Sequence, residues 1–432
     1  MNFYQIEGGF PLKGEIRVQG SKNSVLPILS AAILADGASE LENCPAISDV
    51  QHTMDILKAL GCGCVRDGRQ VTVDAAPLHT NVIPEYLMRE MRSSVIFLGA
   101  LLARTGEATL FYPGGCEIGL RPIDLHLTAL RRLGAEIVCE GSEIRCRASQ
   151  LQGAEVVLPF PSVGATENTM LAATSAAGVT RIHNAAREPE IVDLQRFLAA
   201  MGAKVTGAGS SIITIEGGAP LHGIRYRVDP DRIAAVTWLA AAAAAGGSVT
   251  VSGVQPGRFT AVGAVLREAG CAWKEWSDAV CLTRRGRLRA VRPVRTMPYP
   301  GFPTDAQALL MSVLCSAEGT TIFEENIFEN RFRHVPELRR MGAEISIEDR
   351  RAAVTGVSRL RGTAVRAADL RGGAALALAA LGAEGKTQLS GVELIRRGYE
   401  DLAAVLRSIG AEVTEVQDEV YGEHETKPKN QA

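Results

Sequence analysis

Met341-Gly342-Ala343-Glu344-Ile345-Ser346-Ile347 shows the pattern on which the architecture depends, because the chain contains this pattern six times. An apolar residue, a glycine and then alanine or cysteine end an amphipathic helix, and alternating residues follow as a strand. The copies are Leu60-Gly61-Cys62, Leu133-Gly134-Ala135, Met201-Gly202-Ala203, Ala269-Gly270-Cys271, Met341-Gly342-Ala343 and Ile409-Gly410-Ala411. Successive glycines lie 68 to 73 residues apart, so the repeat covers the whole chain of 432 residues.

Each repeat also contains a second helix upstream, which is rich in alanine and has almost no polar face. Such helices are expected to be buried. They are predicted at 25–34, 94–103, 168–177, 232–245, 305–317 and 372–383. A hairpin ends each unit, as in 207–215. The sequence therefore predicts an α/β protein in which three units plus three is the symmetric division, with the active site between the bundles.

Length and composition narrow the class of protein further. A chain of 432 residues is too long for one core and suggests two or three domains. A net charge of −2 provides no general attraction for nucleic acid or an anionic membrane. The nine cysteines form no CxxC pair, so neither a zinc site nor a disulfide framework is indicated. The N-terminus resembles no signal peptide and the apolar run Ile233–Ala245 is too short to span a bilayer, so we expect a cytoplasmic protein.

The loop 112–122 places one thiol among glycines and prolines, five residues before an arginine. Its glycines permit movement and its prolines stiffen the two ends. A guanidinium such as that of Arg121 favours the thiolate and can hold an anion beside it. Cys116 is therefore a candidate reactive thiol. The alternative, a small buried hydrophobic residue, stays open on this evidence.

Charged residues also interrupt the pattern where buried helices should begin. Lys22 would lie at a positive helix end, which is unfavourable unless an anion neutralises it. Asp305 is either a helix cap or a general base at the mouth of a cleft. Arginines occur at similar places, and together they suggest a cavity for a multiply charged substrate. They are Arg92, Arg121, Arg232, Arg331, Arg371 and Arg397.

In their order along the chain, these segments resemble the enolpyruvyl transferases from about Ile6 to Val420. The matching segments are 20–23, the Cys116 loop with 121–126, 161–166, 184–193, 302–305, 328–332, 369–371 and 397–400. The resemblance implies two inside-out α/β domains, each made of three repeated strand, helix, strand, helix and hairpin units. It places one domain at 22–229 and the other at 1–21 with 230–420. We expect 421–432 to be a disordered tail.

The resemblance is strongest to the branch that acts on UDP-N-acetylglucosamine. It implies transfer of the enolpyruvyl group of phosphoenolpyruvate to the sugar 3′-hydroxyl with release of phosphate, the first committed step of peptidoglycan synthesis. The reaction would pass through a tetrahedral ketal and would need no cofactor or metal. Both substrates are small molecules. We expect no nucleic acid partner, no membrane insertion, and a monomer or a weak homo-oligomer.

The same resemblance implies roles for individual residues. Cys116 would protonate or protect the substrate and would be the target of fosfomycin, while Asp305 would take the hydroxyl proton. Lys22 and Arg397 complete the implied catalytic set, because with Arg121 they would clamp phosphoenolpyruvate. The full implied substrate-binding set is Lys22, Asn23, Arg92, Arg121, Pro122, Ile123, Asp124, Leu125, Ser162, Val163, Gly164, Asp305, Ile327, Arg331, Arg371 and Arg397.

One residue departs from the family's pattern. Arg396 stands beside Arg397 where relatives carry an acidic residue, and two adjacent cations could change the orientation of Arg397. Two alternatives therefore stay open: a catalytically weak paralogue that binds the nucleotide sugar or a protein partner, and the sibling enzyme acting on shikimate 3-phosphate. Because the cationic residues come from both halves of the chain, we expect them to repel across an empty cleft. The nucleotide sugar would then close that cleft.

Overall fold

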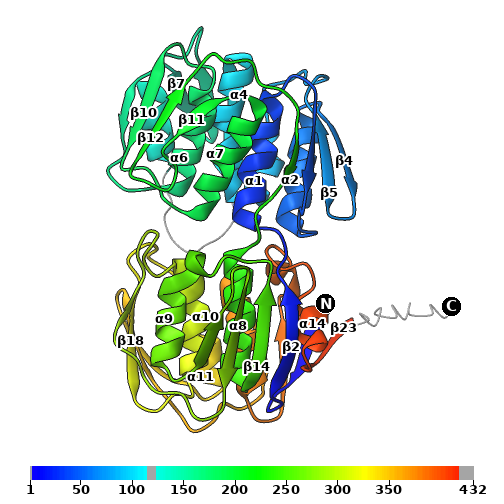
Figure 1. The fold of residues 1–432 in the computed structure, drawn as a ribbon, viewed down its shortest axis with the longest axis vertical. Coiled ribbons are helices and arrows are strands. Elements are labelled where there is room, and N and C mark those ends of the chain that lie inside the picture. Colours follow the sequence, from blue (N-terminus) through cyan, green and yellow to red (C-terminus); the bar gives the residue numbers. More distant parts are fainter. Residues whose placement is uncertain (1, 114–122, 418–432) are drawn as a thin grey trace, which may run out of the picture.

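The computed structural model describes residues 2–113 and 123–417, which form two lobes joined by two adjacent stretches of chain (Figure 1). One hydrophobic core draws on residues between 25 and 228, and the other on residues 4–18 with 233–413. At the crossing, Gly20 and Pro230 form an antiparallel bridge. We propose that the domains follow these cores, at 22–229 and at 1–21 with 230–420. The expected tail at 421–432 lies outside the described residues.

In the first lobe, the described strands form three sheets, each built around an antiparallel hairpin. The first sheet has the order β13 (Arg225–Arg227), β3 (Ala38–Glu42), β5 (Gln70–Asp74) and β4 (Gly63–Asp67). The second has the order β6 (Glu107–Phe111), β8 (Glu143–Arg147) and β7 (Glu136–Glu140). The third has the order β11 (Lys204–Thr206), β12 (Ile212–Glu216), β10 (Val179–His183) and β9 (Glu155–Val157). Strand β13 pairs in parallel with β3, so the end of the third unit completes the first sheet and closes the lobe.

The second lobe closes in the same way, but with strands from the N-terminus. One sheet has the order β21 (Ala364–Arg366), β22 (Lys386–Ser390), β1 (Asn2–Glu7) and β23 (Glu412–Gln417). Another has the order β15 (Ala272–Glu275), β16 (Ala279–Arg284), β14 (Gly247–Ser252) and β2 (Leu12–Arg17). The last has the order β17 (Val294–Arg295), β18 (Thr320–Glu324), β20 (Arg351–Thr355) and β19 (Glu344–Glu348). Strand β1 lies between β22 and β23, with Tyr4 paired to Leu389 on one side and Glu415 on the other.

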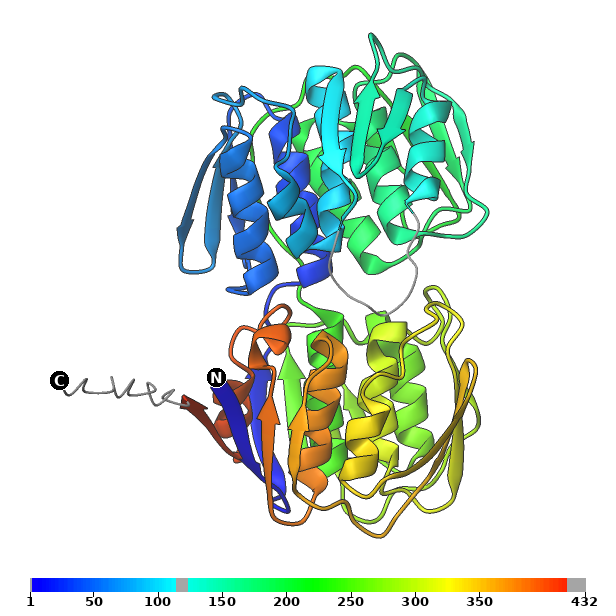
Figure 2. The same cartoon turned by 180° about the vertical axis from the view of Figure 1, so that it is seen from behind.

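Helices fill the interior of both lobes and the sheets lie at the periphery, as Figures 1 and 2 show. The buried helices are α1 (Lys22–Ala31), α4 (Phe97–Thr105), α6 (Val163–Ala173), α8 (Arg232–Ala245), α10 (Thr304–Leu314) and α12 (Leu370–Gly382). In α8 every residue except Ala245 is buried, because its alanines let neighbouring helices approach closely. This inside-out α/β arrangement confirms the predicted fold class and the six buried helices.

The amphipathic helices flank the buried ones. They are α2 (Ser48–Ala59), α5 (Asp124–Arg132), α7 (Pro189–Met201), α9 (Thr260–Glu268), α11 (Val335–Arg340) and α14 (Leu402–Ser408). Shorter helical turns complete the lobes: η1 (Ala32–Leu34), α3 (Glu85–Glu90), η2 (Arg92–Ile96), η3 (Pro256–Phe259) and α13 (Val392–Ile395). The six repeat glycines have φ between 90° and 114°, so each occupies the left-handed region that the sequence predicts at these helix ends.

Candidate active site

A cleft of about 640 Å³ lies between the two lobes, where the sequence analysis expects the active site. Its walls come from both halves of the chain. The lining residues are Ser48, Asp49, His52 and Glu90 from the first lobe, and Arg333, Ala368, Asp369, Glu393, Leu394 and Arg397 from the second. Two clusters of charged side chains stand at this junction, and both contain residues that the sequence singled out.

The first cluster joins Lys22 and Arg397 through Asp49. The Lys22 ammonium lies 2.8 Å from Oδ2 of Asp49. The Arg397 guanidinium contacts the same carboxylate from the other lobe, with Nε 2.9 Å from Oδ1 and Nη2 3.3 Å from Oδ2. Burial acts to raise the pKa of Asp49, but the charges of Lys22 and Arg397 outweigh burial and hold it below its usual range. Asp49 therefore brings one cation from each lobe to a single point of the junction.

Asp49 is a residue that sequence reasoning missed. It is an acidic residue in the first turn of an amphipathic helix, where carboxylates commonly serve only to offset the helix dipole. Only its burial distinguishes Asp49 from such a residue, and its helix neighbours Val50 and Thr53 are buried as well. That burial depends on the fold and could not be read from spacing alone.

The shared carboxylate also changes one expectation about the empty cleft. Lys22 and Arg397 face one another across the lobes, but Asp49 bridges them in this structure, so the expected repulsion between these opposed cations is wrong. The cause is the buried Asp49 carboxylate, whose negative charge lies between the two cations. Whether the nucleotide sugar closes the cleft stays a prediction.

The second cluster is centred on Asp305, the second residue of α10. Its Oδ1 lies 2.6 Å from Nη2 of Arg331 and its Oδ2 lies 3.1 Å from Nη2 of Arg371. The N-cap of α10 is Pro303, so the reading of Asp305 as a mere helix cap is wrong. The side chain is 27% exposed, whereas both arginine side chains are only 4% exposed. The carboxylate is therefore the part of this cluster that solvent can reach, and the two buried arginines hold it in place.

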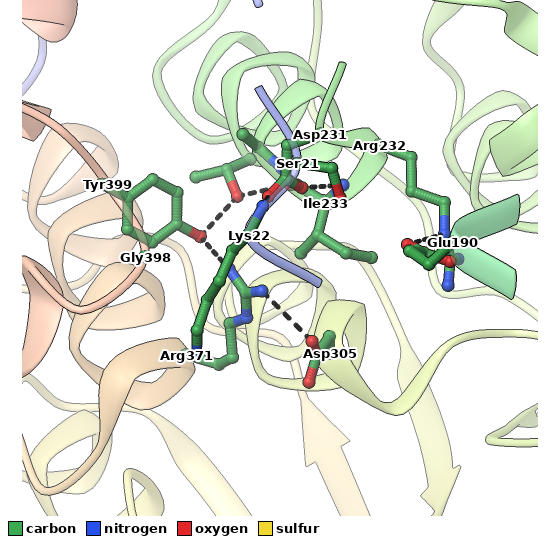
Figure 3. Close-up of polar contacts among 12 residues, drawn as sticks. Ser21, Lys22, Glu190, Asp231, Arg232, Ile233, Asp305, Arg371, Gly398 and Tyr399 are labelled. Atoms are coloured by element: carbon green, nitrogen blue, oxygen red, sulfur yellow. Dashed lines mark hydrogen bonds and ion pairs between the residues drawn. The ribbon is translucent and has the colours of Figure 1, made fainter. Parts of the chain in front are cut away.

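Arg371 is itself held by a chain of buried polar groups (Figure 3). Its Nη1 donates to the Tyr399 hydroxyl at 3.1 Å, and that hydroxyl lies 2.8 Å from the hydroxyl of Thr237. Burial alone would lower the pKa of Arg371, but the charge of Asp305 and the contact with Tyr399 raise it above its usual value. Arg371 thus remains a fixed cation beside Asp305.

Asp231 links the starts of α1 and α8 at the crossing between the lobes. Its Oδ1 accepts the N–H groups of Ile233 and Ala234 at the start of α8, at 2.8 and 2.9 Å. Its Oδ2 accepts the backbone N–H of Lys22, 3.1 Å away, at the start of α1. Ser21 caps α1 by accepting from Ser24. These N–H groups are therefore occupied, and the anion-binding capacity near Lys22 rests on its side chain.

The residues expected to contact the nucleotide lie at the starts of α5 and α6. Ile123 precedes α5, which Asp124 and Leu125 begin, while Ser162 caps α6 ahead of Val163 and Gly164. A side chain at position 164 would meet the His126 ring, since a Cβ there would stand 2.8 Å from Cε1. These two helix ends consequently form one continuous wall.

His126 below this wall is a neutral imidazole. Asn168 Oδ1 accepts the backbone N–H of Gly99 at 2.7 Å, so its amide nitrogen faces Nδ1 of His126, also at 2.7 Å. Nδ1 must then be the acceptor. Burial, with a further contribution from Arg92, lowers the pKa of His126 to about 4. The imidazole therefore serves as a fixed support for the wall.

The remaining expected residues are only partly accounted for. Asn23 and Arg92 are half-buried near the starts of α1 and η2. The backbone N–H of Ile327 donates to Glu325 at 2.9 Å, and Glu325 also accepts from Thr304 beside Asp305. Cys116, Arg121 and Pro122 lie outside the described residues.

Arg396 does not join the site. Its guanidinium lies 2.6 Å from Oε1 of Glu415 on β23, and the side chain is 45% exposed. The expectation that Arg396 could reorient Arg397 is therefore not supported, because the two side chains bind different carboxylates. Across residues 2–113 and 123–417, no helix is both long and apolar enough to cross a membrane.

Comparison with known proteins identifies close relatives. The sequence profile of the EPSP synthase (3-phosphoshikimate 1-carboxyvinyltransferase) family matches residues 6–406. The chain is 49% identical to UDP-N-acetylglucosamine 1-carboxyvinyltransferase 2 of Caldanaerobacter subterraneus subsp. tengcongensis, over 96% of this chain and 100% of the relative. It is also 49% identical to UDP-N-acetylglucosamine 1-carboxyvinyltransferase 1 of Carboxydothermus hydrogenoformans, over 97% of this chain and 99% of the relative.

Solved structures agree in fold. The enolpyruvyl transferase NikO from Streptomyces tendae superposes with a TM-score of 0.85 at 28% identity, covering 96% of this chain and 98% of that one. An EPSP synthase from Acinetobacter baumannii superposes with a TM-score of 0.74 over 96% of this chain and 100% of that one. At 19% identity the second likeness supports the fold alone.

Proposed function

This chain belongs to the EPSP synthase (3-phosphoshikimate 1-carboxyvinyltransferase) family, and on that premise we propose that it transfers the enolpyruvyl group of phosphoenolpyruvate to UDP-N-acetylglucosamine. The 3′-hydroxyl of the sugar is the acceptor and phosphate is released. The observation that carries this assignment is near full-length identity of 49% to two relatives named for that reaction. By this function the protein is a transferase of peptidoglycan synthesis that works in the cytoplasm.

The two charged clusters suit the two parts of this reaction. Lys22 and Arg397, with Arg121, would take the anionic groups of phosphoenolpyruvate, because cations fixed in a cleft stabilise the charge that develops there. Asp305 would accept the proton of the attacking hydroxyl. Its carboxylate is 27% exposed and is oriented by two buried arginines, so it is accessible and held in one position for a substrate hydroxyl. Cys116 would serve as the acid toward the vinyl carbon or form a transient thioether.

The nucleotide sugar would lie against the other wall of the cleft. The starts of α5 and α6, with Asp124, Leu125 and Ser162 to Gly164, would receive the uridine diphosphate, since helix N-termini favour phosphate. Asn23 and Asp305 would hold the sugar, while Arg92, Ile327, Arg331 and Arg371 complete the pocket. The reacting groups come from both lobes, so neither lobe alone would be active.

The two alternatives have less support. The family name includes the shikimate 3-phosphate reaction, but the relatives that match at 49% carry the UDP-N-acetylglucosamine name, and the EPSP synthase structure is only 19% identical. The weak-paralogue reading rested on Arg396, which binds Glu415 away from the site.

Phosphate release from phosphoenolpyruvate tests the assignment directly. We expect release with UDP-N-acetylglucosamine, together with a product that carries a vinyl ether by NMR, and none with shikimate 3-phosphate. Release that depends on shikimate 3-phosphate would replace this function with that of the sibling enzyme. Tight binding of the nucleotide sugar without any product would favour the binding paralogue.

A further inference from the structure

Asp49 touches two of the cations to which the proposed function assigns the anionic donor substrate. It is the second residue of α2 and is only 4% exposed, yet it lines the inter-lobe cleft. Its Oδ2 accepts from the Lys22 ammonium at 2.8 Å, and both its oxygens accept from Arg397. A buried carboxylate in two ion pairs at a substrate cleft needs an explanation beyond helix capping.

The three residues span the junction between the lobes. Lys22 and Asp49 belong to the first lobe and Arg397 belongs to the second. The carboxylate therefore fixes the position of the Lys22 ammonium relative to the Arg397 guanidinium. Without a negative charge between them, the ammonium and guanidinium would repel and separate. The fork-like contact with Arg397 also sets the plane of the guanidinium, because two parallel hydrogen bonds allow one orientation.

We propose that Asp49 is a positioning residue that holds Lys22 and Arg397 at one separation and orientation for the anionic groups of phosphoenolpyruvate. This inference rests on the proposed function and deepens it. The carboxylate has the same chemistry as a carboxylate or phosphate oxygen of the substrate, so substrate and Asp49 share the two cations. Asp49 therefore weakens the attraction for the substrate somewhat, while it preserves the geometry that the transition state needs.

A purely structural role makes different predictions. A carboxylate in the first turn of α2 would stabilise that helix through its dipole, and its loss would lower stability without a specific effect on the donor substrate. Ile47, the N-cap of α2, makes no side-chain hydrogen bond to the helix, so the Asp49 carboxylate does stabilise this helix end. That effect is confined to α2. The kcat and the KM for phosphoenolpyruvate distinguish this helix-stabilising role from the proposed positioning role.

Asp49→Asn tests the proposal by removing the charge at nearly constant volume. We expect kcat to fall at least tenfold while the KM for phosphoenolpyruvate stays equal or decreases. Asp49→Glu keeps the charge but changes its position, so its kcat should also fall, by less than tenfold. The matched control is Asp401→Ala, which removes the cap of α14, a helix that contributes no residue to the cleft lining, and should lower Tm but not kcat. Equal kcat values in Asp49→Asn and wild type would overturn the proposal, as would a rise in KM alone. An unchanged kcat in Asp49→Glu would show that the separation does not matter.

Inorganic phosphate provides a readout that does not depend on turnover. A phosphate ion can replace the missing charge, so it should raise the Tm of Asp49→Asn by more than it raises the Tm of wild type or Asp401→Ala. Equal increases in all three would overturn the positioning role, whatever reaction the enzyme performs. Absence of product from wild type would instead contradict the proposed function, and the phosphate comparison would still decide the role of Asp49.

Discussion

Two aspartates, Asp49 and Asp305, each hold a pair of cations, but the solvent exposure of their side chains differs. The Asp49 side chain is 5% exposed and that of Asp305 is 27% exposed. A carboxylate must reach the substrate to accept its proton, so only Asp305 is suited to act as the base. The same charge pattern thus supports positioning in one cluster and chemistry in the other.

Asp305→Asn should bind UDP-N-acetylglucosamine but turn over about 10²–10⁴ times more slowly, because the amide keeps hydrogen bonding and loses basicity. The substitution also removes the charge partner of Arg331 and Arg371, so the variant should be less stable than wild type. Single-turnover rates should therefore be measured well below the Tm of the variant. A kcat within a few-fold of wild type would exclude Asp305 as the base.

Cys116 should be the thiol whose alkylation stops the reaction. Among the described cysteines, burial raises the pKa of Cys44, Cys146 and Cys315 to about 12, which makes them poor nucleophiles. Cys139 is exposed and will also react. Fosfomycin or iodoacetamide, followed by mass mapping, should show activity loss in step with modification of Cys116. Cys139→Ser serves as the control and should be inactivated at the wild-type rate; inactivation with Cys116 unmodified would contradict the prediction.

At the scale of elements, the site depends on where buried helices begin. The helices α1, α6, α8 and α12 start at the lobe junction, and each is capped by a serine or aspartate side chain. These caps are Ser21, Ser162, Asp231 and Asp369. Short polar side chains at these points satisfy the first N–H groups of otherwise apolar helices, which allows the helix ends to be buried next to a charged site.

Asp231→Ala should destabilise the protein by about 2 kcal/mol, because it removes the cap of α8 and the acceptor for the Lys22 N–H together. Asp231→Asn should cost less, since its amide oxygen can still cap α8. Urea unfolding measures both, with Asp401→Ala as a single-cap control at about 1 kcal/mol. An equal loss for Asp231→Ala and Asp401→Ala would mean that the link to α1 contributes nothing.

At the scale of the whole molecule, the lobes are held together by contacts on both sides of the crossing. Arg232 on α8 pairs with Glu190 on α7 at 2.9 Å, and both are buried (Figure 3). Asp49 and Arg397 form the link at the cleft. Buried pairs of this kind depend strongly on both partners, so the lobe arrangement is sensitive to changes in protonation.

Acid should weaken the fold at two buried histidines, His126 and His334. Burial lowers the pKa of His126 and His334 to about 4, whereas an unfolded histidine titrates near 6.5. At these two imidazoles the folded form binds fewer protons than the unfolded form between these values, so the stability that they contribute above pH 6.5 declines as pH falls toward 4. The contribution is on the order of 3 kcal/mol per imidazole.

The free energy of unfolding, measured from pH 7.5 to 4.5, tests this prediction. His126→Gln should reduce the slope in that window, while His222→Gln, at an exposed position, should leave it unchanged. An identical slope for wild type and His126→Gln would show that His126 is not held neutral in the fold.

Periodicity and helix-end glycines are local properties of the chain, so the repeat, the buried helices and most of the charged positions can be predicted from the sequence. Lys22, Asp305, Arg371 and Arg397 stood out because a charge at the start of an apolar helix breaks a local pattern. How those charges pair depends on contacts that form only when the chain folds. Asp49 resembles an ordinary first-turn carboxylate until the other lobe brings Arg397 to it, since an ion pair across 348 residues depends on the closure of two lobes. For the same reason the sequence suggested that Arg396 could disturb Arg397, whereas in the folded protein its side chain forms an ion pair with Glu415.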